Sequence, residues 1–99
     1  RLWRRKIKEK WEYECAYCGA DTDLTIDHVV PRAKGGADFT NNVVCCCAPC
    51  NQNKGHQSWE EWYFSQDFFD KDRYEKIQDW MKPEKENLFL YRPRRNNCS

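Results

Sequence analysis

The chain has 99 residues, seven of them cysteine, and a formal net charge of +1, which excludes a strongly basic or strongly acidic protein. A chain of this length forms one domain with a small apolar core, so a metal ion or disulfides are expected to support the fold. The odd cysteine count and the lack of an apolar run long enough for a signal peptide or a membrane span favour a cytoplasmic protein with reduced thiols over a secreted or membrane protein.

The first predicted elements are a helix and a strand. Trp3, Ile7 and Trp11 recur at helical spacing among charged residues, which predicts a helix over residues 2–12 that packs on the core. Residues 24–30 are β-branched and alternating, which predicts a strand that ends at the following proline.

A turn, a second strand and a helix are expected next. Residues 34–38, Lys-Gly-Gly-Ala-Asp, have the composition of a turn, and residues 41–45 are predicted to return as a short strand. A helix is expected to begin near residues 51–55. This order of elements predicts a ββα unit.

The C-terminal half is predicted to be mostly helical. Ser58 and Glu61 have the spacing of a capping box, and Asp70 is expected to cap a second helix. Residues 88–91 are compatible with an edge strand. One face of the second helix is apolar, made of Tyr74, Ile77, Trp80 and Met81. Further aromatic residues are expected to be core rather than a base-stacking surface: Trp59, Trp62, Tyr63, Phe64, Phe68 and Phe69.

Two Cys-x-x-Cys pairs predict a structural zinc site. The pairs are Cys15 with Cys18 and Cys47 with Cys50. Each places two sulfurs on one side of a tight turn, and a tetrahedral Zn²⁺ takes four such ligands, so the segment between the pairs is expected to be a closed loop. Cys46 with Cys50 stays an alternative second pair. Otherwise Cys45 and Cys46 are expected to be buried small residues, and Cys98 an idle terminal thiol.

The closed loop contains groups suited to a second, catalytic metal site. The Asp27 carboxylate is a hard ligand for Mg²⁺ or Mn²⁺, and a neutral His28 imidazole can take a proton from water. Neighbours on a strand face opposite sides, so both serve one site only where the strand twists or ends. Asn51 offers an amide oxygen directly after the last cysteine of the pairs, and His56 is a rival metal ligand.

Two further residues are expected to support this site. Asn42 is predicted to orient rather than to ligate, by hydrogen bonds to the loop backbone that hold the His28 ring. Lys54, one helical turn after Asn51, is predicted to present its ammonium to a phosphate. Taken singly, Asn51 as a helix cap and Lys54 as a solvated lysine stay open as alternatives.

These motifs, in this order, resemble the HNH endonucleases of the ββα-metal fold over about residues 15–55. The matching segments are Cys15-Ala-Tyr-Cys18-Gly19, Leu24-Thr-Ile-Asp27-His28-Val-Val-Pro31, Lys34-Gly35-Gly36, Asn42-Val-Val and Cys47-Ala-Pro-Cys50-Asn51-x-x-Lys54-Gly55. The resemblance implies an α+β fold, with a ββα-metal core and a four-cysteine structural zinc site, flanked by an N-terminal helix and C-terminal helices.

The resemblance also implies roles for individual residues. In this family the residue matching Asp27 is a metal ligand, the one matching His28 is the general base, the one matching Asn42 braces the base loop, and the one matching Asn51 completes the metal site. The last position is often histidine in the family. The implied reaction is divalent-metal-dependent nicking or cleavage of DNA, which leaves a 5′-phosphate and a 3′-hydroxyl.

The charge is unevenly distributed, which favours a polyanionic partner. Basic residues gather near both ends and beside the predicted site: Arg1, Arg4, Arg5, Lys6, Lys8, Lys10, Lys34, Lys54, Arg92, Arg94 and Arg95. Arg4, Arg5, Lys34 and Lys54 are expected to bind DNA phosphates. For the first ten residues alone, a solvated flank explains the charge equally well.

Residues 1–99 are expected to form a single HNH nuclease domain. The motif core is residues 15–55, preceded by a basic helix within 1–14 and followed by a helical extension and basic tail, 56–99. The protein is expected to bind DNA and no membrane, as a monomer or a weak dimer. The competing interpretations are a non-catalytic, zinc-stabilised nucleic-acid-binding module and a protein-interaction module built on the aromatic, acidic C-terminal half.

Overall fold

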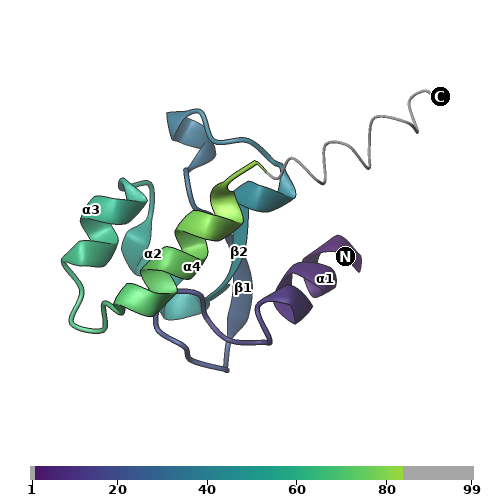
Figure 1. Ribbon diagram of the computed structural model, residues 1–99, viewed down its shortest axis with the longest axis horizontal. Coiled ribbons are helices and arrows are strands. Elements are labelled where there is room, and N and C mark those ends of the chain that lie inside the picture. The colour runs from purple at the N-terminus through teal and green to yellow at the C-terminus, as the bar shows by residue number, and fades with distance from the viewer. Residues whose placement is uncertain (1, 84–99) are drawn as a thin grey trace.

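The computed structural model describes residues 2–83 of the chain (Figure 1). The elements in chain order are helix α1 (Leu2–Lys10), strand β1 (Leu24–His28), two short 3-10 helices η1 (Arg32–Lys34) and η2 (Thr40–Asn42), strand β2 (Val43–Cys47), and helices α2 (Ala48–Lys54), α3 (Trp59–Phe64) and α4 (Lys71–Met81). This is a small α+β fold around a ββα unit, as predicted. The predicted edge strand at 88–91, the basic residues at 92–95 and Cys98 lie outside the described residues.

The two strands pair antiparallel, with Leu24 opposite Cys47 and His28 opposite Val43. The first strand is confirmed, but it ends at His28 rather than at residue 30. The predicted bounds 41–45 of the second strand are wrong, because Thr40–Asn42 form a 3-10 turn and the pairing with β1 continues through Cys47. All five β2 residues are buried, so this strand shows no alternation from which its register can be read.

Helix α2 follows β2 without a loop. It begins at Ala48 rather than near Asn51, and Pro49 lies in its first turn, where a missing N–H costs no hydrogen bond. Gly55 ends the helix with φ 55° and ψ −131°, a conformation that glycine adopts without side-chain strain. Because β2 leads directly into α2, the second cysteine pair is held at the strand–helix junction.

Helix α1 packs one side on the strands and exposes the other. Ile7 and Trp11 are buried, as their spacing predicts, whereas Trp3 at the start of the stripe is 38% exposed. The chain leaves the helix through Glu12 and Tyr13, which have positive φ angles of 58° and 56°. The exposed side of α1 carries the basic residues of the N-terminal segment.

The two C-terminal helices begin where the sequence predicts, by different means. Asp70 caps α4, with its Oδ1 accepting a hydrogen bond from the Arg73 backbone N–H at 3.1 Å. Helix α3 starts after Ser58, but the Ser58 side chain makes no capping hydrogen bond, so the predicted capping box is wrong. The helix is instead held by packing, since Trp59 is buried at its first position.

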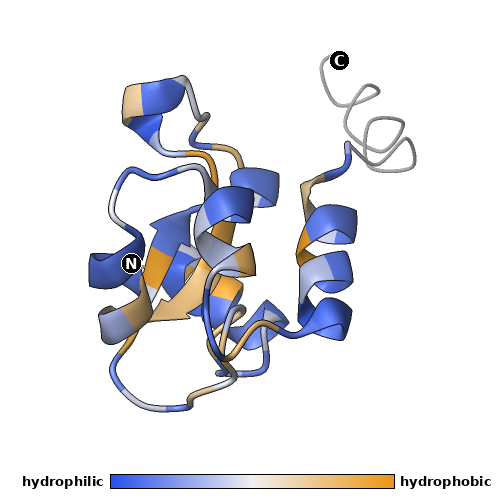
Figure 2. Cartoon of the chain, turned by 90° about the vertical axis from the view of Figure 1, so that its left-hand side faces the viewer, coloured by the Kyte–Doolittle hydropathy of each residue, from blue (hydrophilic) through white to orange (hydrophobic). Residues whose placement is uncertain are grey.

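The core gathers side chains from the four α-helices, from both strands and from the segment between α1 and β1. Figure 2 shows the hydrophobic segments on and beside the strands, while the helices are largely hydrophilic. Trp59, Trp62 and Tyr63 are buried, as expected of core residues. Phe64 and Phe68 are 54% and 38% exposed, so the core prediction is wrong for these two. Phe64 is the last residue of α3, and Phe68 lies in the segment between α3 and α4. No helix within residues 2–83 has the length and apolarity needed to cross a membrane.

Helix α4 ties both ends of the ββα unit together. The Trp80 indole N–H lies 2.9 Å from the Val43 carbonyl at the start of β2. At the other end of α4 the Arg73 guanidinium donates to the Cys15 carbonyl at 3.3 Å. The helix therefore spans from the first cysteine pair to the loop before β2, and Figure 1 shows α4 leading to the C-terminal end of the described chain.

Candidate active site and metal centre

Four cysteines converge at one end of the hairpin. The sulfurs of Cys15, Cys18, Cys47 and Cys50 all lie within 4.8 Å of one another, and those of Cys18 and Cys47 are 3.7 Å apart. A zinc ion about 2.3 Å from each sulfur of a regular tetrahedron separates the sulfurs by about 3.8 Å. The group is therefore placed to hold a metal ion such as zinc, and Cys47, rather than Cys46, supplies the partner of Cys50.

The thiols outside the group differ from each other. Hydrogen bonds from the Cys46 and Cys50 thiols lower the pKa of Cys15. Cys46 thus supports a ligand without belonging to the four. Cys45 is an ordinary buried thiol, and burial raises its pKa to about 11.

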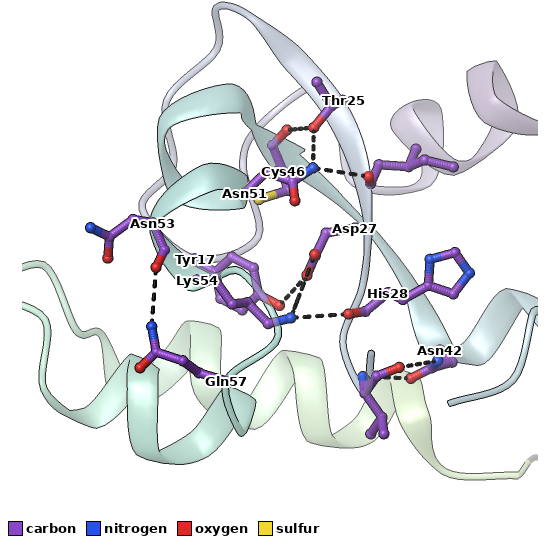
Figure 3. Close-up of polar contacts among 12 residues, drawn as sticks. Tyr17, Thr25, Asp27, His28, Asn42, Cys46, Asn51, Asn53, Lys54 and Gln57 are labelled. Carbon is purple, nitrogen blue, oxygen red and sulfur yellow. Dashed lines mark hydrogen bonds and ion pairs between the residues drawn. The ribbon is translucent and has the colours of Figure 1, made fainter. Parts of the chain in front are cut away.

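Asp27 lies in the interior on β1. Its Oδ2 accepts a hydrogen bond from the Tyr17 hydroxyl at 2.9 Å and forms an ion pair with the Lys54 ammonium at 3.1 Å. The same ammonium donates a hydrogen bond to Oδ1 at 3.5 Å. Burial raises the pKa of Asp27, and the charge of Lys54 and the Tyr17 hydroxyl oppose that rise. Figure 3 shows Tyr17 and Lys54 meeting at this carboxylate. The ionised carboxylate is therefore compensated by one cation and one neutral donor.

Lys54 is directed inward, which corrects the prediction that it presents its ammonium outward to a phosphate. The residue is 0% exposed, and its Nζ also donates to the His28 carbonyl at 3.0 Å. The ammonium is drawn inward because Asp27 is the nearest charge of opposite sign and a buried carboxylate needs a partner. Lys54 thus links the α2 helix to β1 beneath the site.

Asn51 and Asp27 face one pocket. The Asn51 Nδ2 donates to the Thr25 hydroxyl at 3.0 Å and to the Ile26 carbonyl at 3.2 Å. Its amide oxygen has no hydrogen-bond partner within residues 2–83. The pocket has a volume of about 250 Å³ and is lined by Asp27, His28, Asn51, His56 and five neighbours. The structure therefore brings together the residues predicted to hold the catalytic ion, with His56, the rival ligand, exposed beside them.

His28 follows Asp27 at the end of β1 and its ring points to the other side of the strand (Figure 3). The side chain is 26% exposed, and its Nε2 lies 2.8 Å from Asp38 Oδ1. His28 lines the 250 Å³ pocket and also a second pocket of about 440 Å³, which Arg4, Arg32 and Asp38 share. His28 therefore lines both pockets. Strand β1 ends at His28, which is the condition under which Asp27 and His28 can serve one site.

Asn42 closes the loop that joins the strands. Its side-chain oxygen accepts from the Val30 N–H at 2.9 Å, and its Nδ2 donates to the Val30 and Ala37 carbonyls at 3.0 and 2.8 Å. A methyl group on Gly36 would lie 1.7 Å from the Val30 carbonyl oxygen, so only glycine fits the closed loop. Within residues 2–83 the Asn42 side chain hydrogen-bonds the loop backbone and not the His28 ring.

The predicted phosphate-binding residues other than Lys54 are on the surface. Arg4 and Arg5 are exposed on α1, and Lys34 is exposed in η1. Of these, Arg4 lines a pocket together with His28. Sequence reasoning missed Tyr17 and Arg32 as site residues, and it placed Asp38 only in a turn. The available signals were the position of Tyr17 inside the first cysteine pair and that of Asp38 just after the two glycines.

The chain is similar to known nucleases over most of its described length. Residues 15–67 match the model of a protein family described as HNH endonuclease. A CRISPR-associated endonuclease Cas9 of Corynebacterium diphtheriae is 37% identical over 65 residues, which cover 62% of this chain and 6% of that protein. An SPbeta prophage-derived "putative HNH endonuclease" of Bacillus subtilis is 29% identical over 97 residues, which cover 83% of this chain and 41% of that protein.

A solved structure shares the fold. The crystal structure of the type II-C Cas9 enzyme from Actinomyces naeslundii matches with a TM-score of 0.64 at 23% identity, over 91% of this chain and 10% of that one. The chain thus spans a small part of the Cas9 proteins and less than half of the prophage protein.

Proposed function

Since this chain belongs to the HNH endonuclease family, we propose that it hydrolyses phosphodiester bonds of DNA with a divalent metal ion and with His28 as general base. One observation carries the proposal. A carboxylate, an imidazole and an amide, from Asp27, His28 and Asn51, line a single pocket, and Asn51 directly follows Cys50 of the cysteine group. We also propose that residues 1–99 act as one nuclease domain.

The donor set fits a hard divalent ion. The Asp27 carboxylate and the Asn51 amide oxygen are oxygen ligands of the kind that Mg²⁺ and Mn²⁺ prefer. When bound, such an ion supplies positive charge for the phosphate and the departing 3′-oxygen. Lys54 and Tyr17 hold the Asp27 carboxylate in place from the interior.

His28 is proposed to take the proton of the attacking water. The water oxygen bonds to phosphorus, its proton passes to the imidazole, and the bond from phosphorus to the 3′-oxygen breaks. The departing 3′-oxygen takes a proton from solvent, so the products carry a 5′-phosphate and a 3′-hydroxyl. The ring is half-buried rather than enclosed, so a duplex end or strand can reach it from solvent.

The remaining residues are proposed to support this chemistry. Zinc held by the four cysteines fixes the ends of the loop that carries the site, because ligand binding and folding are coupled in a domain this small. Asn42 keeps the loop closed, and Arg4, Arg5 and Lys34 attract the DNA backbone.

Supercoiled plasmid tests the proposal. The zinc-loaded protein is incubated with Mg²⁺, Mn²⁺ or EDTA, and nicked and linear products are measured. We expect nicked or linear DNA with a divalent ion and none with EDTA. His28→Ala is expected to remove the activity, and His56→Ala, which changes the rival ligand, is expected to retain it. If His56→Ala lost as much activity as His28→Ala, the choice of His28 over His56 as the site histidine would be wrong.

One observation favours a second function. The Asp27 carboxylate already has a buried cationic partner in Lys54, as expected if Asp27 were structural and the protein were a non-catalytic, zinc-stabilised nucleic-acid-binding module. DNA binding by folded, zinc-loaded protein without cleavage in any divalent metal would select this function over hydrolysis.

A further inference from the structure

We propose that Asp38, held by Arg32, positions the His28 ring and keeps a proton on its Nε2, so that Nδ1 is the atom left to accept a proton from water. This inference rests on the proposed function, because it assigns a positioning residue to the proposed base. It concerns two side chains that neither the family resemblance nor the predicted site included.

The contacts form a short chain across the loop. His28 Nε2 lies 2.8 Å from Asp38 Oδ1. Arg32 donates two hydrogen bonds to the same carboxylate, from Nε to Oδ1 at 2.9 Å and from Nη2 to Oδ2 at 2.7 Å. A guanidinium that binds both oxygens fixes the plane of the carboxylate, so the oxygen facing the imidazole has a defined position.

The chemistry of the acceptor settles where the imidazole proton lies. An ionised carboxylate only accepts hydrogen bonds, so the nitrogen that meets it must carry the hydrogen. The hydrogen bonds from Arg32, and to a lesser extent the one from His28, lower the pKa of Asp38 to about 2. Asp38 is therefore ionised at neutral pH. In the neutral ring the other nitrogen, Nδ1, then has a free lone pair.

The backbone of Asp38 is held on both sides by one residue. The Ala37 carbonyl accepts from the Asn42 side chain at 2.8 Å, and the Phe39 carbonyl accepts from the Asn42 backbone N–H at 2.9 Å. Asn42 thus clamps both neighbours of Asp38. The predicted link from Asn42 to the His28 ring therefore runs through Asp38 rather than through direct contact.

Stability is not the reason for these contacts. The Arg32 and Asp38 side chains are 69% and 58% exposed, and exposed ion pairs add little to folding. Substituting Asp38 should leave the protein folded and zinc-loaded. A fall in rate would then report on the ring and not on unfolding.

Nuclear magnetic resonance of the histidine rings gives the first test. The chain has two histidines, and His56, which is exposed, serves as the internal reference. In the wild-type protein we expect a hydrogen-bonded Nε2–H resonance from His28, with its proton protected from exchange with water, and no such resonance from His56. Asp38→Ala should lose the protected proton, and Asp38→Asn, which keeps an acceptor oxygen, should retain it in part. A protected proton on Nδ1, or an unchanged His28 spectrum in Asp38→Ala, would overturn the proposal.

Cleavage kinetics give the second test. At saturating DNA and metal, Asp38→Ala is expected to lower the single-turnover rate by about 10- to 100-fold, the usual effect of losing a group that orients a site residue. The substitution removes a negative charge, so DNA affinity should stay the same or rise. Arg32→Ala should lower the rate less and weaken DNA binding, and Asp67→Ala, a surface carboxylate away from the site, should change neither.

The two tests separate this proposal from the proposed function. An Asp38→Ala protein that cleaves at the wild-type rate would refute the positioning role. A wild-type protein that cleaves no DNA with any divalent metal would refute the nuclease function, and the ring proton would still decide whether Asp38 positions His28.

Discussion

Replacing Lys54 by methionine tests how the buried carboxylate of Asp27 is maintained. Methionine keeps the unbranched chain and removes the charge. Lys54 is 0% exposed and Asp27 is 6% exposed, so the change leaves a buried carboxylate with the Tyr17 hydroxyl as its remaining side-chain donor. Removing one partner of a buried ion pair costs about 3–5 kcal/mol. That is a large part of the total free energy of unfolding of a protein domain, about 5–15 kcal/mol.

Urea unfolding of the zinc-loaded protein measures the loss. The midpoint should fall with an unchanged slope, because the variant still buries the same surface. Lys82→Met is the matched control, because it breaks an exposed ion pair with Asp79 and should change stability little. Adding Asp27→Asn to Lys54→Met removes the uncompensated charge, so the double variant should be more stable than Lys54→Met by about 2 kcal/mol.

The loss should depend on pH with a defined sign. Burial raises the pKa of Asp27, so the folded protein holds this proton more tightly than the unfolded chain does. Stability from the group is therefore present at low pH and falls as pH rises through the raised pKa. Without Lys54 that pKa rises further, so the loss should grow as pH rises through the raised pKa of the variant. Equal stability of Lys54→Met and wild type across the whole pH series would refute the role given to the ion pair.

Three further substitutions probe the base, the cysteine group and the loop. His28→Ala should stay folded and lose about 10² to 10⁴ in plasmid cleavage rate, the typical contribution of a general base; cleavage at the parental rate would exclude His28. Cys15→Ser should bind less zinc and unfold, as circular dichroism and metal analysis would show, because zinc affinity is folding free energy here; a folded, active, zinc-free variant would contradict this. Gly36→Ala should lower the melting temperature, since its methyl group meets the Val30 carbonyl; an unchanged melting temperature would mean that the loop yields freely.

Local patterns account for the parts of the fold that the sequence predicts well. The spacing of apolar residues in α1, the Asp70 cap of α4 and the β-branched residues of β1 are all local patterns. Each depends on residues only a few positions apart. They were found with small errors in their bounds. The bounds of β2 were not, because every residue of that strand is buried and the turn before it is held by contacts with α4.

For the site, the sequence by itself determined the two Cys-x-x-Cys pairs and the grouping of Asp27, His28 and Asn51 at one pocket. A Cys-x-x-Cys turn holds two sulfurs on one side, and it places Asn51 directly after Cys50. Only the tertiary structure decided where the long, flexible charged side chains go. Lys54 turns inward because Asp27 is buried beside it, and Asp38 reaches His28 because the loop folds back across ten residues. Such pairings follow from the cost of leaving charge unpaired in the interior and from loop closure, neither of which residue spacing encodes.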